Sequence, residues 1–551
     1  MKDDGKDKKT GQELINITGG TQTVLQRVLK IFSVICKVMS FAVVLLFCFL
    51  GMLLFEGIRW ALDTWSNLSM EEIVYHLQSP LEGTNQDLIY DFMNAALSPA
   101  ILVLVTTLII LLIFRKKKHT QQLVMKIMIA LSLCVGFSSV YFGWKTLKVG
   151  DYLAGQSEES TFIQDNYVPP DSVEITFPEQ KRNLIYIFLE SMESTYSSKK
   201  NGGAYEDNYI PELTRLAKEN THFSNTDLLG GAVPTKGATW TIGGMFAQTS
   251  GLPLLIPIGD NSMDTQDTFL PDVTALGDIL KNQGYQQMLM VGSDATFGGR
   301  KNYFTHHGNF GIYDVFTARE SGDIPEDYTA WWGFEDEKLF SFAQQKILEL
   351  SLTGQPFNFT MLTADTHFED GYPCRLCDDK FEDNQYANVI ACSSRQVYAF
   401  VQWIQQQEFY ANTTIVISGD HLTMDSDFCE DIDSEYERTV YNVIINPAIT
   451  TERTKNRIFT TLDMFPTTLA AMGVDIEGNK LGLGTNLFSD KDTLAEEYGR
   501  IKINNEFGKN SSFFSDMTKN MLSIEGNVLE LNHELQLLKN NIPDGFGEKT
   551  P

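Results

Sequence analysis

Basic residues are scarce in this chain of 551 residues, in which 43 Lys and Arg face 71 Asp and Glu. The formal net charge is therefore -28. Such an acidic chain repels the phosphates of DNA and RNA, which argues against a nucleic-acid partner. The chain also lacks internal repeats, and its length exceeds that of one ordinary domain.

Cysteine is sparse too, with seven residues in two groups. Three lie in or beside apolar runs, where a thiol acts as a small apolar side chain: Cys36, Cys48 and Cys134. Four lie in the acidic part: Cys374, Cys377, Cys392 and Cys429. If that part is exported, this even set predicts two disulfides in any of three pairings. Zinc binding by Cys374 and Cys377 is the alternative.

Three apolar runs approach the ~20 residues that a helix needs to cross a bilayer. They cover residues 38–58, 99–114 and 127–147. The second run is the shortest, and a buried helix of a globular domain is its alternative interpretation. We expect three membrane spans and therefore a protein bound to the lipid bilayer.

Charges beside these runs predict the orientation in the membrane. Arg27, Lys30 and Lys37 precede the first run, and a basic cluster at residues 115–119 separates the second from the third. The loop at residues 56–98 is acidic instead. The positive-inside rule then puts the N-terminus in the cytoplasm and everything after the third span outside a bacterial plasma membrane. The first run lies too far along the chain, and lacks the small-residue cleavage site, for a removable signal peptide.

Changes in composition divide the chain into five parts. A polar cytoplasmic leader (1–27) precedes the transmembrane domain (28–149). An acidic linker (150–180) leads to an extracytoplasmic domain (181–489) that we expect to be catalytic, and a tail (490–551) follows.

Strand-like runs alternate with helical patterns throughout residues 181–489. The expected strands are 183–189, 286–292, 357–364, 413–418 and 440–446. The expected helices lie near 209–220, 273–283, 335–350, 393–407 and 462–472. This alternation predicts an α/β fold with a mostly parallel sheet sandwiched by helices.

Three of the expected strands end in residue types that bind divalent metals. The first ends at Glu190, another is followed by Asp365 and His367, and a third leads into Asp420 and His421. In open α/β sheets, ligands gather at the carboxyl ends of the strands. The sequence therefore predicts a metal site at this edge.

We take Glu190, Asp420 and His421 as the metal ligands, since carboxylate and imidazole groups suit a divalent ion. Plainer interpretations exist: Glu190 as a helix cap, or Asp420 as a turn cap beside a surface His421. His367 is suited to bind a phosphate oxygen or to protonate a leaving alkoxide.

A glycine-rich segment, residues 230–245, runs into an expected helix that starts with small residues and hydroxyls. The free N–H groups and the dipole of a helix N-terminus suit a phosphate. A threonine there, bound to the metal, would have the lowered hydroxyl pKa that a nucleophile needs. The alternative is an ordinary N-cap threonine.

Several segments together resemble the alkaline phosphatase superfamily. They are residues 184–191, 240–245, 251–254, 365–367, 419–421, 463–467 and 481–484. They are similar to those of lipoteichoic acid synthases and phosphoglycerol transferases, above all the glucan-modifying transferases. The resemblance covers residues 183–488 and the multi-span N-terminal plan.

The resemblance implies a fold, a reaction and a cofactor. The fold would be alkaline phosphatase/sulfatase-like, with one Mn²⁺ or Mg²⁺ ion. A metal-bound threonine would attack the phosphorus of phosphatidylglycerol and release diacylglycerol. The glycerophosphate would then pass to a cell-envelope polysaccharide. Arg300 resembles the family arginine that holds the phosphate, and Asp365, His367 and Trp240 would join it around the substrate.

The chain departs from the family pattern at the nucleophile. The family register puts the threonine at residue 238, where this chain has Ala238. We favour a one-residue shift that makes the neighbouring Thr239 both nucleophile and metal ligand; Thr235 and Thr241 lie close by. An engineered alanine variant and a natural pseudoenzyme are the alternatives.

Three rival functions remain. A phosphoethanolamine transferase would share the metal site and use another lipid headgroup. A catalytically disabled homologue would bind lipid or glycan without chemistry. A sulfatase is disfavoured, because the Cys or Ser that is followed at a fixed spacing by Pro and Arg is missing around Ala238.

Overall fold

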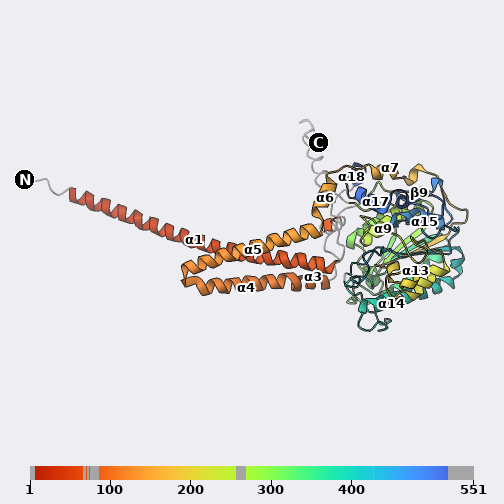
Figure 1. Ribbon diagram of the computed structural model, residues 1–551, viewed down its shortest axis with the longest axis horizontal. Helices are drawn as coiled ribbons and strands as arrows, with labels where there is room; N and C mark the ends of the chain where they lie inside the picture. The colour runs from red at the N-terminus through yellow and green to blue at the C-terminus, as the bar shows by residue number, and fades with distance from the viewer. Residues whose placement is uncertain are drawn as a thin grey trace, which may run out of the picture. The chain divides into compact units, whose positions relative to one another are not determined.

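The computed structural model describes residues 7–65, 70, 73–74, 86–255, 268–425 and 427–518. The chain forms two compact units, whose elements are labelled in Figure 1. The first unit contains Met1–Asp63 and Gln86–Thr146, and the second contains Thr64–Asn85 and Leu147–Pro551.

The first unit is helical in the residues that the structure describes. Its elements are α1 (Asp7–Thr64), α3 (Gln86–Phe92), a π-helical turn (Met93–Leu97), α4 (Ser98–Ile113) and α5 (Lys118–Thr146). Val44 and Cys48 of α1 pack with Leu111 of α4 and with Val124 and Met128 of α5, so the three long helices lie side by side (Figure 1). Helix α1 begins at Asp7 and takes in most of the segment that we expected as a polar leader.

Three helical stretches are long and apolar enough to cross a membrane: Val28–Thr64, Ile89–Lys116 and Lys118–Thr146. Large apolar side chains face outwards from them, such as Phe32 at 64% and Phe137 at 71% exposure. A surface of this kind is stable in lipid and unstable in water. The three expected apolar helices are therefore confirmed, and the protein is membrane-anchored. The orientation in the membrane stays a prediction.

A six-stranded sheet in the order β4-β3-β5-β2-β6-β7 forms the centre of the second unit. The strands are β2 (Asn183–Leu189), β3 (Gln286–Val291), β4 (Gly311–Tyr313), β5 (Phe357–Leu362), β6 (Thr413–Gly419) and β7 (Asn442–Ile445). All neighbours pair in parallel except β6 and β7, which are antiparallel. The prediction of a mostly parallel sheet is confirmed. The short edge strand β4 carries too few residues to stand out in the sequence.

Helices cover both faces of this sheet, which explains why its central strands are continuous apolar runs. On one face, Leu184, Tyr186 and Phe188 of β2 share a core with α9 (Thr241–Ser250), α10 (Leu276–Asn282) and α15 (Met464–Ala471). On the other face, Ile185 and Ile187 share a core with α8 (Pro211–Glu219), α13 (Asp336–Ser351) and α14 (Gln385–Gln405). Successive residues of a strand point to opposite faces, so β2 contributes to both cores.

Helix α14 begins at Gln385, earlier than the expected 393–407. The side chain of Asn384 accepts a hydrogen bond from the Ala387 amide and caps the helix. The remaining helices are α6 (Val149–Gln156), α7 (Phe162–Asn166), α11 (Arg300–His306), α12 (Val315–Glu320), α16 (Leu494–Tyr498), α17 (Arg500–Phe507) and α18 (Ser512–Thr518). Two small antiparallel pairs complete the unit: β1 (Ile175–Thr176) with β8 (Asp475–Ile476), and β9 (Lys480–Leu481) with β10 (Gly484–Thr485).

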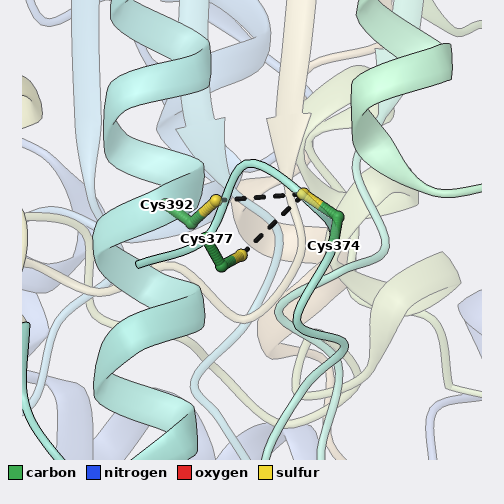
Figure 2. A group of neighbouring side chains, drawn as sticks. All are labelled: Cys374, Cys377 and Cys392. Carbon is green, nitrogen blue, oxygen red and sulfur yellow. Dashed lines mark hydrogen bonds between the residues drawn. The ribbon is translucent and has the colours of Figure 1, made fainter. Parts of the chain in front are cut away.

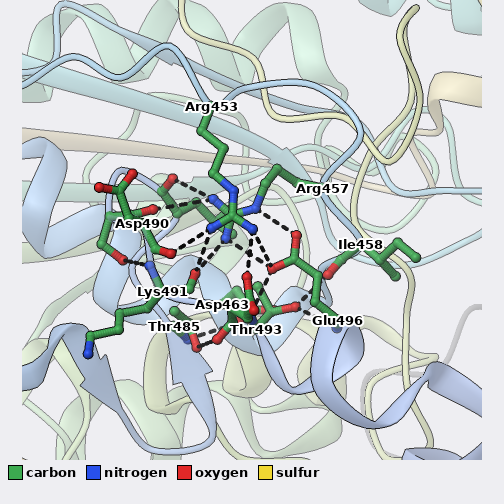
Figure 3. Close-up of polar contacts among 12 residues, drawn as sticks. Arg453, Arg457, Ile458, Asp463, Thr485, Asp490, Lys491, Thr493 and Glu496 are labelled. Carbon is green, nitrogen blue, oxygen red and sulfur yellow. Dashed lines mark hydrogen bonds and ion pairs between the residues drawn. The ribbon is translucent and has the colours of Figure 1, made fainter.

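The first part of the expected tail is built into the second unit. Phe507 of α17 and Phe514 of α18 are buried in the same core as β2. Arg457 donates to the carboxylate of Glu496 on α16 and to the carbonyl of Lys491 (Figure 3). Residues 519–551 of the tail lie outside the described residues.

Candidate metal centre and active site

The carboxyl ends of β2 and β6 bring the expected ligands together. The strands run parallel with Leu189 opposite Gly419, so the residues that follow them meet at one edge. Ligand atoms of Glu190, Asp420 and His421 all lie within 4.8 Å of one another. Nε2 of His421 is 3.3 Å from Oε1 of Glu190 and 3.5 Å from Oδ2 of Asp420. The three side chains are 2%, 0% and 2% exposed, which removes them from water.

Hydrogen bonds orient each of these side chains. The backbone amides of Ser191 and His421 donate to Oδ1 of Asp420, at 2.8 and 2.7 Å. The hydroxyl of Ser191 donates to Oε1 of Glu190 at 2.8 Å. Nδ1 of His421 donates to the carbonyl oxygen of Leu422 at 2.7 Å, which leaves Nε2 to face the carboxylates and, in the neutral ring, to bind a metal. Oδ2 of Asp420 is buried without a hydrogen-bond partner.

The two carboxylates and the imidazole of the cluster interact strongly. Burial and the nearby Glu190 together raise the pKa of Asp420 to about 8. Burial alone would lower the pKa of His421, but attraction to Asp420 and Glu190 raises it to about 10. Burial also acts to raise the pKa of Glu190, and the attraction of His421 outweighs it and lowers that pKa. A divalent ion would supply this positive charge, so the donor set and the orphaned Asp420 oxygen fit one.

The hydroxyl that reaches this cluster belongs to Thr241. Its Oγ1 lies 3.3 Å from Oε2 of Glu190 and 3.4 Å from Nε2 of His421. The hydroxyl of Thr239, which we favoured, is buried and has no hydrogen-bond partner. Ala238 is fully buried, and its amide donates to the carbonyl oxygen of Thr235.

The start of α9 explains why Thr241 faces the cluster. Trp240 is extended and buried, and Thr241 is the first helical residue. Gly244, one turn later on the same face, lies against the backbone of Asp420.

His367 lies beside the cluster. Thr366 donates to the carbonyl oxygen of Glu190 at 2.6 Å, which fixes the backbone next to His367. The His367 ring packs against Trp332 and Phe368. Burial lowers the pKa of His367, with an opposing attraction from Glu190.

Arg300 and Asp365, which we expected to contact the substrate, form hydrogen bonds with other residues of the protein. Arg300 donates to the carbonyl oxygens of Phe297 and Asp294, at 3.0 and 2.7 Å. Asp365 accepts from the amide of Asp336, whose carboxylate in turn accepts from the amides of Ala364 and Asp365. Burial raises the pKa of Asp365 to about 10, and the neighbouring Asp336 adds to this. Asp365 therefore braces the β5 loop in this structure.

All seven cysteines are free thiols, so the two expected disulfides are absent from the structure. Cys374, Cys377 and Cys392 nevertheless form a second cluster of potential metal ligands. Cys429 lies outside that cluster.

Known proteins match a large part of this chain in sequence. Phosphoglycerol transferase I of Escherichia coli is 32% identical over 375 residues, which are 65% of this chain and 47% of that protein. The protein of the same name from Shigella boydii matches equally well. The chain thus spans about half the length of the curated relatives that it matches.

Solved structures match this chain at lower identity. An alkaline phosphatase superfamily protein from Vibrio parahaemolyticus gives a TM-score of 0.46 at 20% identity, covering 58% of this chain and 72% of that one. The lipoteichoic acid synthase LtaP from Listeria monocytogenes gives 0.45 at 17% identity, covering 60% and 82%. The profile of the sulfatase family matches residues 182–474, more than half of the chain. The chain therefore belongs to the sulfatase family, in the alkaline phosphatase superfamily.

Proposed function

We propose that this protein is a metal-dependent phosphoglycerol transferase whose nucleophile is Thr241. The observation that carries the proposal is the position of the Thr241 hydroxyl, within 3.4 Å of both Glu190 and His421. The phosphotransferase class is supported by the relatives named phosphoglycerol transferase I. Thr239, which the sequence favoured, is the competing nucleophile.

The proposed donor is phosphatidylglycerol and the acceptor a hydroxyl of a cell-envelope polysaccharide. The three apolar helices support a lipid donor, because they keep the protein at the bilayer. The positive-inside pattern supports a site outside a bacterial plasma membrane. The expected Mn²⁺ or Mg²⁺ suits a site with two carboxylates.

The residues divide the chemistry as follows. When bound by Glu190, Asp420 and His421, the ion would neutralise charge on the phosphate and favour the ionised hydroxyl. The oxygen of Thr241 would attack phosphorus while the bond to the diacylglycerol oxygen breaks, and the proton that the Thr241 hydroxyl loses would pass through water to that oxygen. A hydroxyl of the polysaccharide would then displace Thr241 from the phosphorus.

His367 is suited to the second of these steps. Its Nδ1 donates to the carbonyl oxygen of Phe368 at 2.6 Å, so Nε2 is the free acceptor of the neutral ring. Burial lowers the pKa of His367, which favours the neutral ring. A neutral ring accepts a proton, so we propose that His367 takes the proton of the incoming hydroxyl rather than protonating the leaving alkoxide.

The test uses the full chain in detergent with Mn²⁺ and phosphatidylglycerol that carries a labelled headgroup. Diacylglycerol release and the labelled peptide are measured for the unmodified chain, Thr241→Ala, Thr241→Ser and Thr239→Ala. We expect Thr241→Ala to lose at least ~10³-fold in rate, Thr241→Ser to keep part of it, and Thr239→Ala to keep most. Metal content and melting temperature report whether each variant folds.

The other outcomes separate the rival functions. Label on Thr239 would assign the nucleophile to that residue. Faster turnover of phosphatidylethanolamine than of phosphatidylglycerol would indicate a phosphoethanolamine transferase. If the unmodified chain releases no diacylglycerol and Ala238→Thr does, the protein is a disabled homologue.

A further inference from the structure

A second set of potential metal-ligand side chains is separate from the Glu190 centre. Cys374 and Cys377 follow β5 in a Cys-x-x-Cys segment, and Cys392 lies on α14. Sγ of Cys374 is 3.8 Å from Sγ of Cys377 and 3.9 Å from Sγ of Cys392. All three sulfurs lie within 4.8 Å of one another, and Figure 2 shows them pointing toward a common centre.

These distances fit a bound ion better than a disulfide. A disulfide requires two sulfurs at ~2.05 Å and would leave the third thiol unused. Tetrahedral zinc holds thiolates at ~2.3 Å, which puts neighbouring sulfurs about 3.8 Å apart. Cys374 stands at nearly this distance from both of its neighbours, so one ion would engage all three sulfurs.

Polar groups surround Sγ of Cys374. The sulfurs of Cys377 and Cys392 and the backbone amides of Leu376 and Cys377 lie within hydrogen-bonding reach of it. Backbone N–H groups that point at the first sulfur of a Cys-x-x-Cys turn stabilise a negative ligand atom. The side-chain amide of Gln396 also contacts Sγ of Cys374 and Sγ of Cys392, at 3.7 and 3.5 Å.

We propose that Cys374, Cys377 and Cys392 bind a thiophilic ion, zinc, as a structural site separate from the Glu190 centre. Soft thiolates select zinc, whereas carboxylates suit Mn²⁺ and Mg²⁺. The cysteine site and the Glu190 centre would therefore bind different metals. The three sulfurs leave one tetrahedral position for water or an added ligand. This inference does not depend on the proposed transferase activity.

The site would fasten the segment that follows His367 to α14. The amide of Tyr372 donates to the carbonyl oxygen of Asp365 at 2.7 Å, so the cysteine segment folds back on the end of β5. A Cβ on Gly371 would lie 2.6 Å from that same carbonyl, which leaves no room for the segment to move closer. Strand β5 holds one end of the loop that carries His367, and zinc would hold the other end.

The test measures metal content in the full chain, purified in detergent without chelators after growth with added zinc. We expect about one zinc per chain, lost on Cys374→Ser or Cys392→Ser and kept on Cys429→Ser. Glu190→Gln should keep this zinc and lose the ion of the other centre, which distinguishes the two sites. Melting temperatures confirm that the serine variants fold.

Cobalt gives an independent readout. Loaded with Co²⁺, the unmodified chain and Glu190→Gln should show thiolate-to-cobalt charge-transfer absorption, and Cys392→Ser should lose it. If Cys392→Ser binds as much zinc as the unmodified chain, the proposal is wrong. A disulfide among the three cysteines, found by peptide mapping of the freshly purified chain under non-reducing conditions, would also overturn it.

Discussion

A Cβ atom on Gly244 would lie 2.2 Å from the carbonyl oxygen of Asp420. No side chain can occupy that position unless α9 moves away from the end of β6. The contact therefore sets the distance between Thr241, at the start of α9, and the proposed ligands Asp420 and His421. The glycine allows the helix N-terminus to approach the metal centre.

Gly244→Ala should push α9 away from β6 and displace the Thr241 hydroxyl. We expect a loss of transferase rate of at least ~10-fold and a destabilisation of ~1–3 kcal/mol, measured by turnover and by denaturation. Gly311→Ala is the matched control, since its Cβ would meet only the carbonyl oxygen of Gln287 at 3.7 Å. Equal effects of the two substitutions would contradict this account.

Ser191→Ala should weaken metal binding without removing a ligand. Its hydroxyl donates to Oε1 of Glu190 at 2.8 Å, and supporting bonds of this kind are worth ~10–100-fold in metal affinity. Titration of the metal-free protein with Mn²⁺ measures the change. Ser172→Ala, at an exposed turn, should leave the affinity unchanged.

Arg457→Met should destabilise the second unit strongly. The guanidinium is 1% exposed and donates to Glu496 and to the carbonyl oxygens of Leu487 and Lys491 (Figure 3). Removing one partner of a buried pair costs ~3–5 kcal/mol, because the other is left uncompensated.

Arg453→Met provides the comparison. Arg453 pairs with Asp492 at 2.6 Å, but their side chains are 35% and 57% exposed. Water screens such a pair, so its loss should cost ~0–1 kcal/mol. Denaturant midpoints of both variants check the difference, and similar losses would refute the distinction.

His222 should make the fold sensitive to acid. Nε2 donates to the carbonyl oxygen of Gly230 and Nδ1 accepts from Lys455, so the ring is satisfied only when neutral. Burial lowers its pKa to about 3, and Lys455 adds to the effect. The unfolded chain binds the proton first, so the stability is complete above pH ~6.5 and falls by up to ~1.4 kcal/mol per pH unit as the pH drops toward 3.

The measurement is the melting temperature as a function of pH for the unmodified chain and for Lys455→Met. Removing the cation lets His222 accept a proton more readily in the folded state. The acid-induced loss between pH ~6.5 and ~3 should therefore become shallower in the variant. If the melting temperature of Lys455→Met falls as steeply with decreasing pH as that of the unmodified chain, His222 does not control the acid-induced loss of stability.

Local sequence patterns determined the strands and the edge at which they end. Apolar runs such as 183–189 are strands because both faces are covered, and their polar ends mark where the chain leaves the core. Parallel pairing then brings Glu190, Asp420 and His421 together, whatever the loops between them do. The meeting of these three residues could therefore be predicted from the sequence.

The tertiary structure decided which hydroxyl and which thiols meet. Thr239 and Thr241 are equivalent as residue types, and only the packing of α9 through Gly244 turns Thr241 toward the carboxylates. Likewise, Cys392 joins Cys374 only because α14 packs beside the β5 loop. Strand pairing follows from patterns of a few residues, whereas the direction of a side chain on a helix depends on how distant segments pack.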